Sequence, residues 1–288
     1  MNNSTKILTY TVPQKADGFS LHNYLKQQGF PKHMLIMLKQ GGITVNGKFH
    51  RMIDPVTTGD FIEICFAAET PVLAPNPLLH IPIIYEDEDI VVFSKPANTL
   101  VHPASPKFSD AIGNYFSFLY PNRLFRPIGR LDRDTTGLSP VAKNRLAAVM
   151  LSQNIKKTYT AIAEGILETE NGTIDAPLLR VPGPTIKRTV DPCGQTAITH
   201  YTVLQRLNNH TLVSIKLETG RTHQIRAHFS HIGHPLAGDS LYGGSTESIN
   251  RQALHCHTIQ LIQPTSKEHI SLTAPLPEDM LKLLQADA

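Results

Sequence analysis

The sequence concentrates reactive side chains in one short stretch, Gly129-Arg130-Leu131-Asp132-Arg133-Asp134-Thr135-Thr136-Gly137-Leu138. Two carboxylates and two guanidinium groups lie there within five residues. A carboxylate can attack an electrophilic carbon or remove a proton, and a neighbouring cation keeps the acid ionised. An Asp–Arg salt bridge that closes an ordinary turn would give the same pattern, so the residues alone leave both interpretations open.

The elements around this stretch must hold it rigidly if it does chemistry. Asp and Gly at both of its ends favour a tight turn. Leu138, Val141 and Ala142 follow and predict a buried strand, which would support the charged loop. Pro140 lacks an N–H donor, so we expect this strand to be bulged or to lie at an edge there.

Length and composition narrow the class of protein. The chain has 288 residues with 41% hydrophobic content, enough for one large domain or two. Three cysteines, an odd number without zinc-site spacing, indicate a reduced protein without disulfides. No apolar run could cross a membrane, and the stretch Met1–Lys6 does not begin a secretory signal. We therefore expect a cytoplasmic protein with no membrane partner.

Positive charge is segregated along the chain. Residues 18–53 hold five Lys or Arg and no acid, and residues 120–158 hold eight against Asp132 and Asp134. The overall formal charge is only +3. Clustered cations are typical of proteins that bind polyanions, although ordinary solvated surface explains any single cluster equally well.

The first part of the chain predicts a small unit of its own. Residues 7–12 fit a short strand, and apolar residues at helical spacing predict two short helices separated at Gly29-Phe30-Pro31. A hairpin turn at Asn46-Gly47 and a closing strand follow. Residues 12–68 resemble the small RNA-binding domain shared with ribosomal protein S-four. This resemblance implies that Lys32, His33 and Lys39 face RNA phosphates; an accessory domain that packs on the larger one is the alternative.

A proline-rich segment at residues 69–82 predicts a linker, so we place a larger domain at residues 83–288. Its pattern predicts many strands, few helices and no strict strand–helix alternation. That combination indicates an α+β fold with a largely antiparallel mixed sheet. A strand is expected at residues 157–165, and a helix is expected to open within residues 219–226 and to reach about Ile232.

Four segments of this larger domain resemble the RluA-type RNA pseudouridine synthases. The match covers about residues 80–276, and an S-four-like N-terminal domain is a usual companion. The segments are Lys95-Pro96 to Pro103, Gly129 to Lys143, Lys157-Thr158-Tyr159, and Thr219 to His228 with Gly233-His234-Pro235, Gly238-Asp239 and Tyr242-Gly243.

The resemblance implies a role for individual residues. Asp132 would be the catalytic aspartate, and Arg226 the arginine that pairs with it. Tyr159 would pack against the target base, and Arg130 would enter the RNA where that base leaves. Lys157 and Ile225 fall on pocket positions.

Pseudouridine formation breaks an N–C bond and makes a C–C bond with the same base, so it needs neither a redox partner nor an energy source. The sequence has no nucleotide-phosphate loop, dinucleotide fingerprint or metal-ligand pair at standard spacing. No cofactor is therefore expected. A stacked uridine must first leave the stack, which costs a few kcal/mol.

Two other functions remain open at this stage. One is a catalytically weak or inactive RNA-binding protein on the same scaffold. The other is a zinc-dependent hydrolase built on His223, His228, His231 and His234 or on His255 and His257, although structural histidines are the commoner outcome of such patterns. The expected partner is ribosomal or transfer RNA, and the expected state is a monomer.

Overall fold

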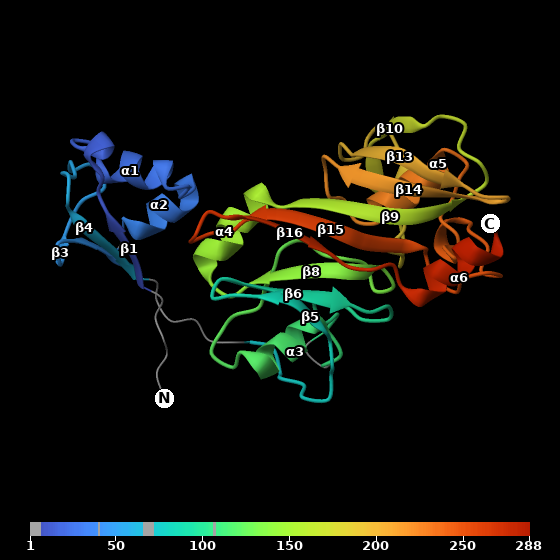
Figure 1. Ribbon diagram of the computed structural model, residues 1–288, viewed down its shortest axis with the longest axis horizontal. Helices are drawn as coiled ribbons and strands as arrows, with labels where there is room; N and C mark the ends of the chain where they lie inside the picture. The colour runs from blue at the N-terminus through green and yellow to red at the C-terminus, as the bar shows by residue number, and fades with distance from the viewer. Residues whose placement is uncertain (1–6, 40, 66–71, 106–107) are drawn as a thin grey trace.

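The N-terminal unit is a four-stranded sheet with two helices (Figure 1). The computed structural model describes residues 7–39, 41–65, 72–105 and 108–288. The unit consists of strands β1 (Ile7–Thr11), β2 (Ile43–Val45), β3 (Lys48–Phe49) and β4 (Phe61–Cys65), the short 3-10 helix η1 (Gln14–Ala16), and helices α1 (Leu21–Gln27) and α2 (Lys32–Leu38). Strand order is β1-β4-β2-β3, so this sheet includes a strand that lies before residue 12.

Local sequence explains these elements. The Ser20 side chain accepts the backbone N–H of Asn23 and so caps α1. Asn46 and Gly47 both have positive φ, 51° and 73°, which is the backbone of a two-residue hairpin turn between β2 and β3. The two predicted helices and the hairpin are therefore present. The predicted boundary at residues 68–69 lies outside the described residues.

The larger part is built on one mixed sheet of ten strands in the order β10-β13-β14-β9-β15-β8-β6-β5, with β16 and β7 added beside β15 and β8. The strands are β5 (Ile83–Glu86), β6 (Ile90–Lys95), β7 (Arg126–Pro127), β8 (Thr136–Ala142), β9 (Lys156–Glu164), β10 (Asn171–Asp175), β13 (Ile198–Arg206), β14 (His210–Leu217), β15 (Leu254–Ile262) and β16 (His269–Thr273). A separate hairpin pairs β11 (Leu178–Arg180) with β12 (Arg188–Val190). The pair β8–β15 is parallel, and the other strand pairs of the described residues are antiparallel. The predicted α+β fold with a largely antiparallel mixed sheet is confirmed.

Helical segments accompany this sheet, and Figure 1 labels α3, α4, α5 and α6 among them. They are α3 (Ile112–Leu119), α4 (Arg145–Asn154), α5 (Gln224–His231), α6 (Glu278–Ala286) and the 3-10 helix η2 (Ser240–Tyr242). Helix α4 also packs on the N-terminal unit, because Leu146 and Met150 are part of that unit's hydrophobic core. Among the described residues, no helix is both long and apolar enough to span a lipid bilayer.

Strand β8 carries the reactive loop, and it is buried along its whole length. It pairs with β6 from Gly137 to Ala142 without a register shift, so the expected bulge is absent. On its other side β8 pairs with β15 at residues 136–137 and with β7 at residues 141–142. The Pro140 carbonyl accepts the backbone N–H of Ile128, the residue after β7, at 2.8 Å. Pro140 has no N–H to donate in return, and the Ile128 carbonyl accepts Lys157 Nζ at 2.8 Å instead.

Candidate active site

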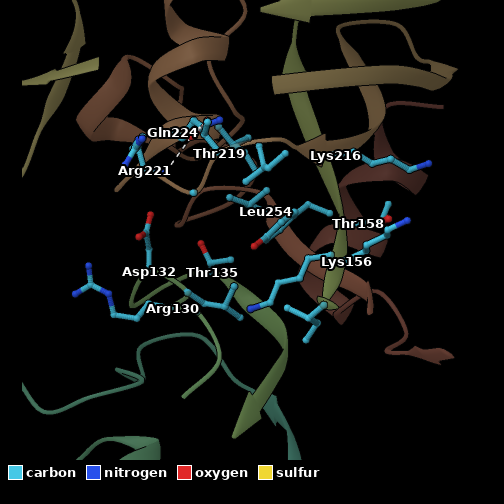
Figure 2. Close-up of a pocket in the computed structure, with 18 of the residues that line it drawn as sticks. Arg130, Asp132, Thr135, Lys156, Thr158, Lys216, Thr219, Arg221, Gln224 and Leu254 are labelled. Carbon is cyan, nitrogen blue, oxygen red and sulfur yellow. Dashed lines mark hydrogen bonds between the residues drawn. The ribbon is translucent and has the colours of Figure 1, made fainter. Parts of the chain in front are cut away.

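A cleft of about 750 Å³ opens beside the reactive loop (Figure 2). One wall is the loop between β7 and β8, and the facing walls are the start of β9 and the segment from the end of β14 into α5. The six catalytic-domain residues assigned from the sequence all line it: Arg130, Asp132, Lys157, Tyr159, Ile225 and Arg226. Lys32 and Lys39 are exposed on the N-terminal unit and do not line this cleft, and the side chain of His33 is not among the described ones.

The loop that carries Asp132 is fixed by contacts from distant segments. Asn98, at positive φ of 54° as its residue type allows, donates its backbone N–H to Asp134 Oδ1 at 3.1 Å. Arg251 donates to the Asp134 carbonyl at 3.1 Å and holds Asp279 of α6 with two hydrogen bonds of 2.6 and 2.8 Å. The loop therefore bears its charged groups on a rigid support, as the sequence predicted.

Lys95 is a buried cation beneath this loop, with only 1% of its surface exposed. Its Nζ donates to three backbone carbonyls: Pro96 at 2.9 Å, Thr99 at 2.6 Å and Arg133 at 2.6 Å. Burial lowers the pKa of the Lys95 ammonium to about 7. The three carbonyls use the three N–H donors of an ammonium group, so the charged form fits this position best.

Arg226 joins the Asp132 loop to helix α5. Its Nη1 donates to Asp132 Oδ2 at 3.2 Å, while its Nε and Nη2 donate to the two carboxylate oxygens of Asp239, each at 2.7 Å. Burial alone would lower the pKa of Arg226, but the Asp239 hydrogen bonds and the two carboxylate charges raise it. The contact with Asp132 that the resemblance implied is present, and Asp239 fixes the orientation of the guanidinium.

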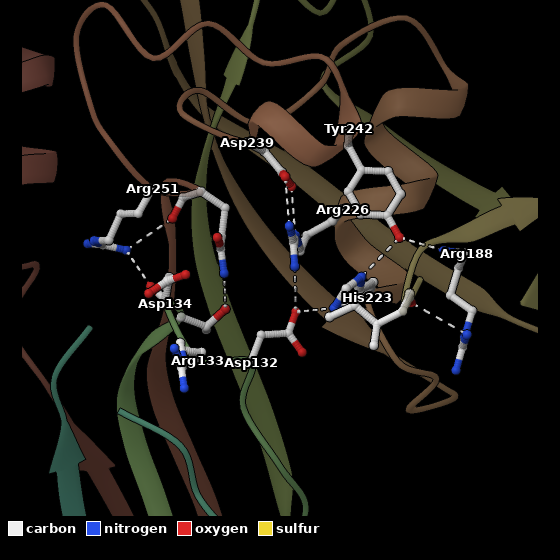
Figure 3. A network of polar contacts seen from close by, with 12 residues as sticks. Asp132, Arg133, Asp134, Arg188, His223, Arg226, Asp239, Tyr242 and Arg251 are labelled. Atoms are coloured by element: carbon white, nitrogen blue, oxygen red, sulfur yellow. Dashed lines mark hydrogen bonds and ion pairs between the residues drawn. The ribbon is translucent and has the colours of Figure 1, made fainter. Parts of the chain in front are cut away.

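His223 approaches the same oxygen of Asp132 as Arg226 does (Figure 3). Its Nε2 lies 3.8 Å from Asp132 Oδ2, and its Nδ1 lies 3.1 Å from the Tyr242 hydroxyl. The backbone N–H of Arg188 donates to that hydroxyl at 2.8 Å. Burial lowers the pKa of His223, with the Asp132 charge acting against it, so the ring is neutral near pH 7.

The backbone at His223 adopts a left-handed conformation, with φ 55° and ψ 18°. This conformation is costly for a residue with a side chain. The Gln224 side chain holds it, because its Oε1 accepts from Thr219 Oγ1 and from the Arg221 backbone N–H, each at 2.9 Å. Helix α5 therefore begins at Gln224, inside the segment 219–226 where the sequence predicted its start, and it ends at His231, next to the predicted end at about Ile232.

The apolar wall of the cleft comes from Tyr159 and Ile225, both buried at its edge. Burial raises the pKa of the Tyr159 hydroxyl well above its ordinary value, so the side chain is a neutral aromatic surface. Lys157 points beneath the loop instead of into open space, because its Nζ donates to the Ile128 carbonyl at 2.8 Å. A Cβ at Gly129 would lie 3.0 Å from this Nζ, and Gly129 has φ 76°, which explains the glycine there.

Positive charge surrounds the cleft. Arg130 and Arg221 are exposed at its mouth on facing segments, and Lys156 and Lys216 are exposed on the adjoining strands β9 and β14 (Figure 2). Several of the histidines that suggested zinc bond other groups: His228, for example, is fully buried and bonds Thr199 Oγ1 and the Ala176 carbonyl, each at 2.9 Å. No group of three or more His, Cys, Asp or Glu in the described part of the chain is arranged to hold a metal ion.

Comparisons with known proteins identify the family of the chain that forms this cleft. Residues 89–231 match the family model described as RNA pseudouridylate synthase. The chain belongs to the RNA pseudouridine synthase family. It is 38% identical over 283 residues to "Uncharacterized RNA pseudouridine synthase YjbO" of Bacillus subtilis, covering 93% of this chain and 99% of that one. It is 36% identical over 312 residues to "Ribosomal large subunit pseudouridine synthase D" of Haemophilus ducreyi, covering 98% and 95% of the two chains.

Solved structures agree with this assignment. The structure of human RNA Pseudouridylate Synthase Domain Containing 1 superimposes with a TM-score of 0.58 and 25% sequence identity, covering 70% of this chain and 86% of that one. The resemblance to RluA-type synthases is thereby confirmed, and the protein is an RNA pseudouridine synthase, an isomerase that acts on RNA.

Four residues of this site received no role in pseudouridine formation from the sequence: Lys95, His223, Asp239 and Tyr242. All four lie inside the segments that carried the family resemblance. Their roles could not be predicted from the sequence, because each residue acts on the Asp132 loop or on Arg226 through contacts that form only in the folded chain.

Proposed function

We propose that this synthase converts uridine to pseudouridine in large-subunit ribosomal RNA, using Asp132 on a target nucleotide that has left its stack and entered the cleft. The observation that carries the proposal is the position of the Asp132 carboxylate: Arg226 holds one oxygen at 3.2 Å in a cleft that Tyr159 also lines. The RNA class rests on relatives named ribosomal large subunit pseudouridine synthase D.

The reaction exchanges one bond at the sugar carbon C1′ for another. The bond from C1′ to N1 of uracil breaks, the bond from C1′ to C5 forms, and the ring transfers one hydrogen in effect from C5 to N1. Neither an oxidant nor an external group is consumed. The protein must therefore loosen the glycosidic bond, hold the free base while it turns, and assist proton transfer.

Asp132 has two routes to the first of these tasks. It can attack C1′ as a nucleophile, as carboxylates do in retaining glycosidases, or it can act as a general base that removes a proton from the neighbouring sugar carbon. Both routes need an ionised carboxylate with one oxygen free. Arg226 and His223 approach Oδ2, and no described residue bonds Oδ1 (Figure 3).

The cleft supports extrusion of the target base. Its volume of about 750 Å³ is in the range of sites that take small molecules, so one nucleotide fits. Tyr159 supplies an aromatic wall, and stacking on an aromatic ring contributes about 1–3 kcal/mol per base. Exposed Arg130, on the loop that carries Asp132, would occupy the gap that the base leaves.

RNA outside the cleft would contact the exposed cations. Lys32 and Lys39 on the N-terminal unit would bind phosphates, in keeping with its resemblance to the S-four-like RNA-binding domain. Every group named in this proposal comes from one chain, so a monomer suffices for the reaction.

The test maps pseudouridine in total RNA from cells with and without the gene. The expected result is the loss of one or more sites in large-subunit ribosomal RNA, restored by the wild type and not by Asp132→Asn. Asp110→Asn, at an exposed acid outside the cleft, is the matched control and should restore every site. Full restoration by Asp132→Asn would refute the role of that carboxylate. Lost sites confined to transfer RNA would refute the RNA class, and no lost site at all would favour a non-catalytic protein.

A further inference from the structure

The cleft holds a buried histidine that the proposed reaction has not used. His223 is 5% exposed and directs its Nε2 at the oxygen of Asp132 that Arg226 also contacts, at 3.8 Å. Hydrogen bonds at active sites are often long without substrate and tighten when it binds. A movement of less than an ångström brings this pair into hydrogen-bond range.

The tautomer of this ring follows from its neighbours. The Tyr242 hydroxyl accepts the Arg188 backbone N–H at 2.8 Å, and its other partner among the described residues is His223 Nδ1 at 3.1 Å. A hydroxyl that accepts one N–H has its own hydrogen left to donate, and Nδ1 is the acceptor within reach. With Nδ1 as acceptor, the hydrogen of the neutral ring lies on Nε2 and faces Asp132.

The backbone conformation at His223 is a second observation that indicates a functional role. It lies in the left-handed region, φ 55° and ψ 18°, and is held there by the Gln224 side chain. Strained backbone of this kind persists where surrounding contacts over-determine it, commonly at functional sites. With this backbone conformation the imidazole Nε2 lies 3.8 Å from Asp132 Oδ2.

We propose that His223 is a positioning residue for Asp132: its Nε2–H, fixed by the Tyr242 hydroxyl, restrains Oδ2 together with Arg226 and leaves Oδ1 as the reacting oxygen. The inference rests on the proposed use of Asp132 and deepens it. A donor on each side of Oδ2 fixes rotation about the carboxylate bond. The free oxygen then faces the sugar in one orientation, and a fixed orientation raises the rate of the chemical step more than the affinity for RNA.

Two substitutions at residue 223 separate this role from a backbone role. His223→Gln places an amide N–H near the position of Nε2, whereas His223→Asn is too short to do so but tolerates the left-handed backbone better. We expect His223→Asn to lower the single-turnover rate about 100-fold, as loss of one preorganised donor does, with the Kd for RNA unchanged within about twofold. His223→Gln should recover at least about tenfold of that loss.

A purely structural role predicts the opposite order, with His223→Asn more active than His223→Gln. That order, or two variants as active as the wild type, would overturn the proposal. Ribosomal RNA purified from the deletion strain is the substrate. Wild type and Asp132→Asn are measured in the same assay. If the wild type is active and Asp132→Asn is inactive, the proposed function holds, and the variants at residue 223 then test the role of His223 alone.

Tyr242→Phe gives a second readout that survives if a variant at residue 223 does not fold. Without the hydroxyl, the neutral ring is free to carry its hydrogen on Nδ1, but the protonated ring carries one on both nitrogens. The charged groups that face His223 are Asp132, Arg226, Asp239 and Arg188, and all four are retained in Tyr242→Phe, so the comparison follows the His223 ring across the range in which histidine changes charge, about pH 5 to 8. The Tyr242→Phe rate relative to wild type should therefore rise as the pH falls through this range; a constant ratio would count against the fixed tautomer.

Discussion

Lys95 Nζ lies 2.6 Å from the backbone carbonyl oxygen of Arg133, the residue that follows Asp132. The same ammonium group also bonds the carbonyls of Pro96 and Thr99, so it joins the segment after β6 to the reactive loop. A buried cation at this point sets the position of the loop backbone. It also makes the stability of the fold depend on pH, because burial lowers its pKa to about 7.

Lys95→Met tests this pH dependence through the free energy of unfolding. An unfolded lysine titrates near pH 10.4, so between about pH 7 and 10 the unfolded state binds more protons at this residue than the folded state. The contribution of Lys95 to the unfolding free energy then rises with pH, by up to about 1.4 kcal/mol per unit. The difference between wild type and Lys95→Met in urea titrations should rise across this window and be flat below about pH 6.

Activity should respond to Lys95 in the opposite sense. Above about pH 7 the amine loses one of its three donors, so the loop is held less firmly and the wild-type rate should fall. Lys95→Met should lack this fall. A wild-type unfolding free energy that runs parallel to that of Lys95→Met from pH 6 to 9 would contradict the lowered pKa.

Arg226→Lys should abolish most of the activity while retaining the charge. A lysine cannot make the two parallel bonds to Asp239 and a third to Asp132, because its ammonium is a single point of donation. We expect kcat to fall about 100-fold or more, equivalent to about 3 kcal/mol, with RNA affinity little changed. Single-turnover kinetics and a separate binding titration measure the two quantities.

The matched control is Arg206→Lys, at an arginine that pairs with largely exposed Glu170 on the surface. Exposed pairs contribute little, so the rate of this variant should stay within about twofold of wild type. Equal losses in the two variants would mean that the assay reports general destabilisation and not the orientation of Arg226.

Features of this site that depend on neighbouring residues could be predicted from the sequence, whereas contacts between distant residues could not. The charged turn at residues 129–138 and the buried strand after it follow from neighbouring residues, and both are present. The contact of Arg226 with Asp132 joins residues 94 positions apart, and it was expected from the family resemblance and not from periodicity. The bond between Arg226 and Asp239 had no signal, because a buried Asp in a loop looks like any turn residue.

The errors have physical causes of the same kind. Residues 219–223 belong to the segment in which the start of α5 was predicted, but Thr219 and Arg221 bond the Gln224 side chain and stay outside the helix, so α5 begins only at Gln224. Strands β10 and β16 were not predicted: β10 buries only Ile174, and β16, although it alternates polar and apolar residues, has no fully buried residue. Tertiary contacts determine the secondary structure of such segments, and these contacts cannot be inferred from the local sequence.

The N-terminal unit should contribute affinity and not chemistry. Replacing both Lys32 and Lys39 by Ala should weaken RNA binding and lower the slope of log Kd against log salt by about 1.5, because each lost phosphate contact removes about 0.7–0.9. The single-turnover rate at saturating enzyme should be unchanged. Lys282→Ala, which removes an exposed lysine of α6 paired with Glu278, is the control. A slope that is the same in the double variant and wild type would exclude these lysines from the RNA interface.

Arg130→Ala should slow the reaction according to how firmly the target uridine is stacked. Arg130 is exposed on the loop that carries Asp132, so its side chain can enter the RNA without disturbing the bonds of Asp132 to α5. If it occupies the space of the departing base, its removal makes extrusion less favourable by part of the unstacking cost of a few kcal/mol, and the rate should fall about tenfold to 100-fold. The loss should shrink when the target uridine is placed opposite a mismatch or in a single-stranded loop, because those bases leave the stack more easily.

Arg133→Ala, at the exposed arginine three residues further along the same loop, controls for lost charge near the cleft. The same rate loss on paired and unpaired targets would show that Arg130 acts on binding or on the carboxylate, and not on extrusion of the base.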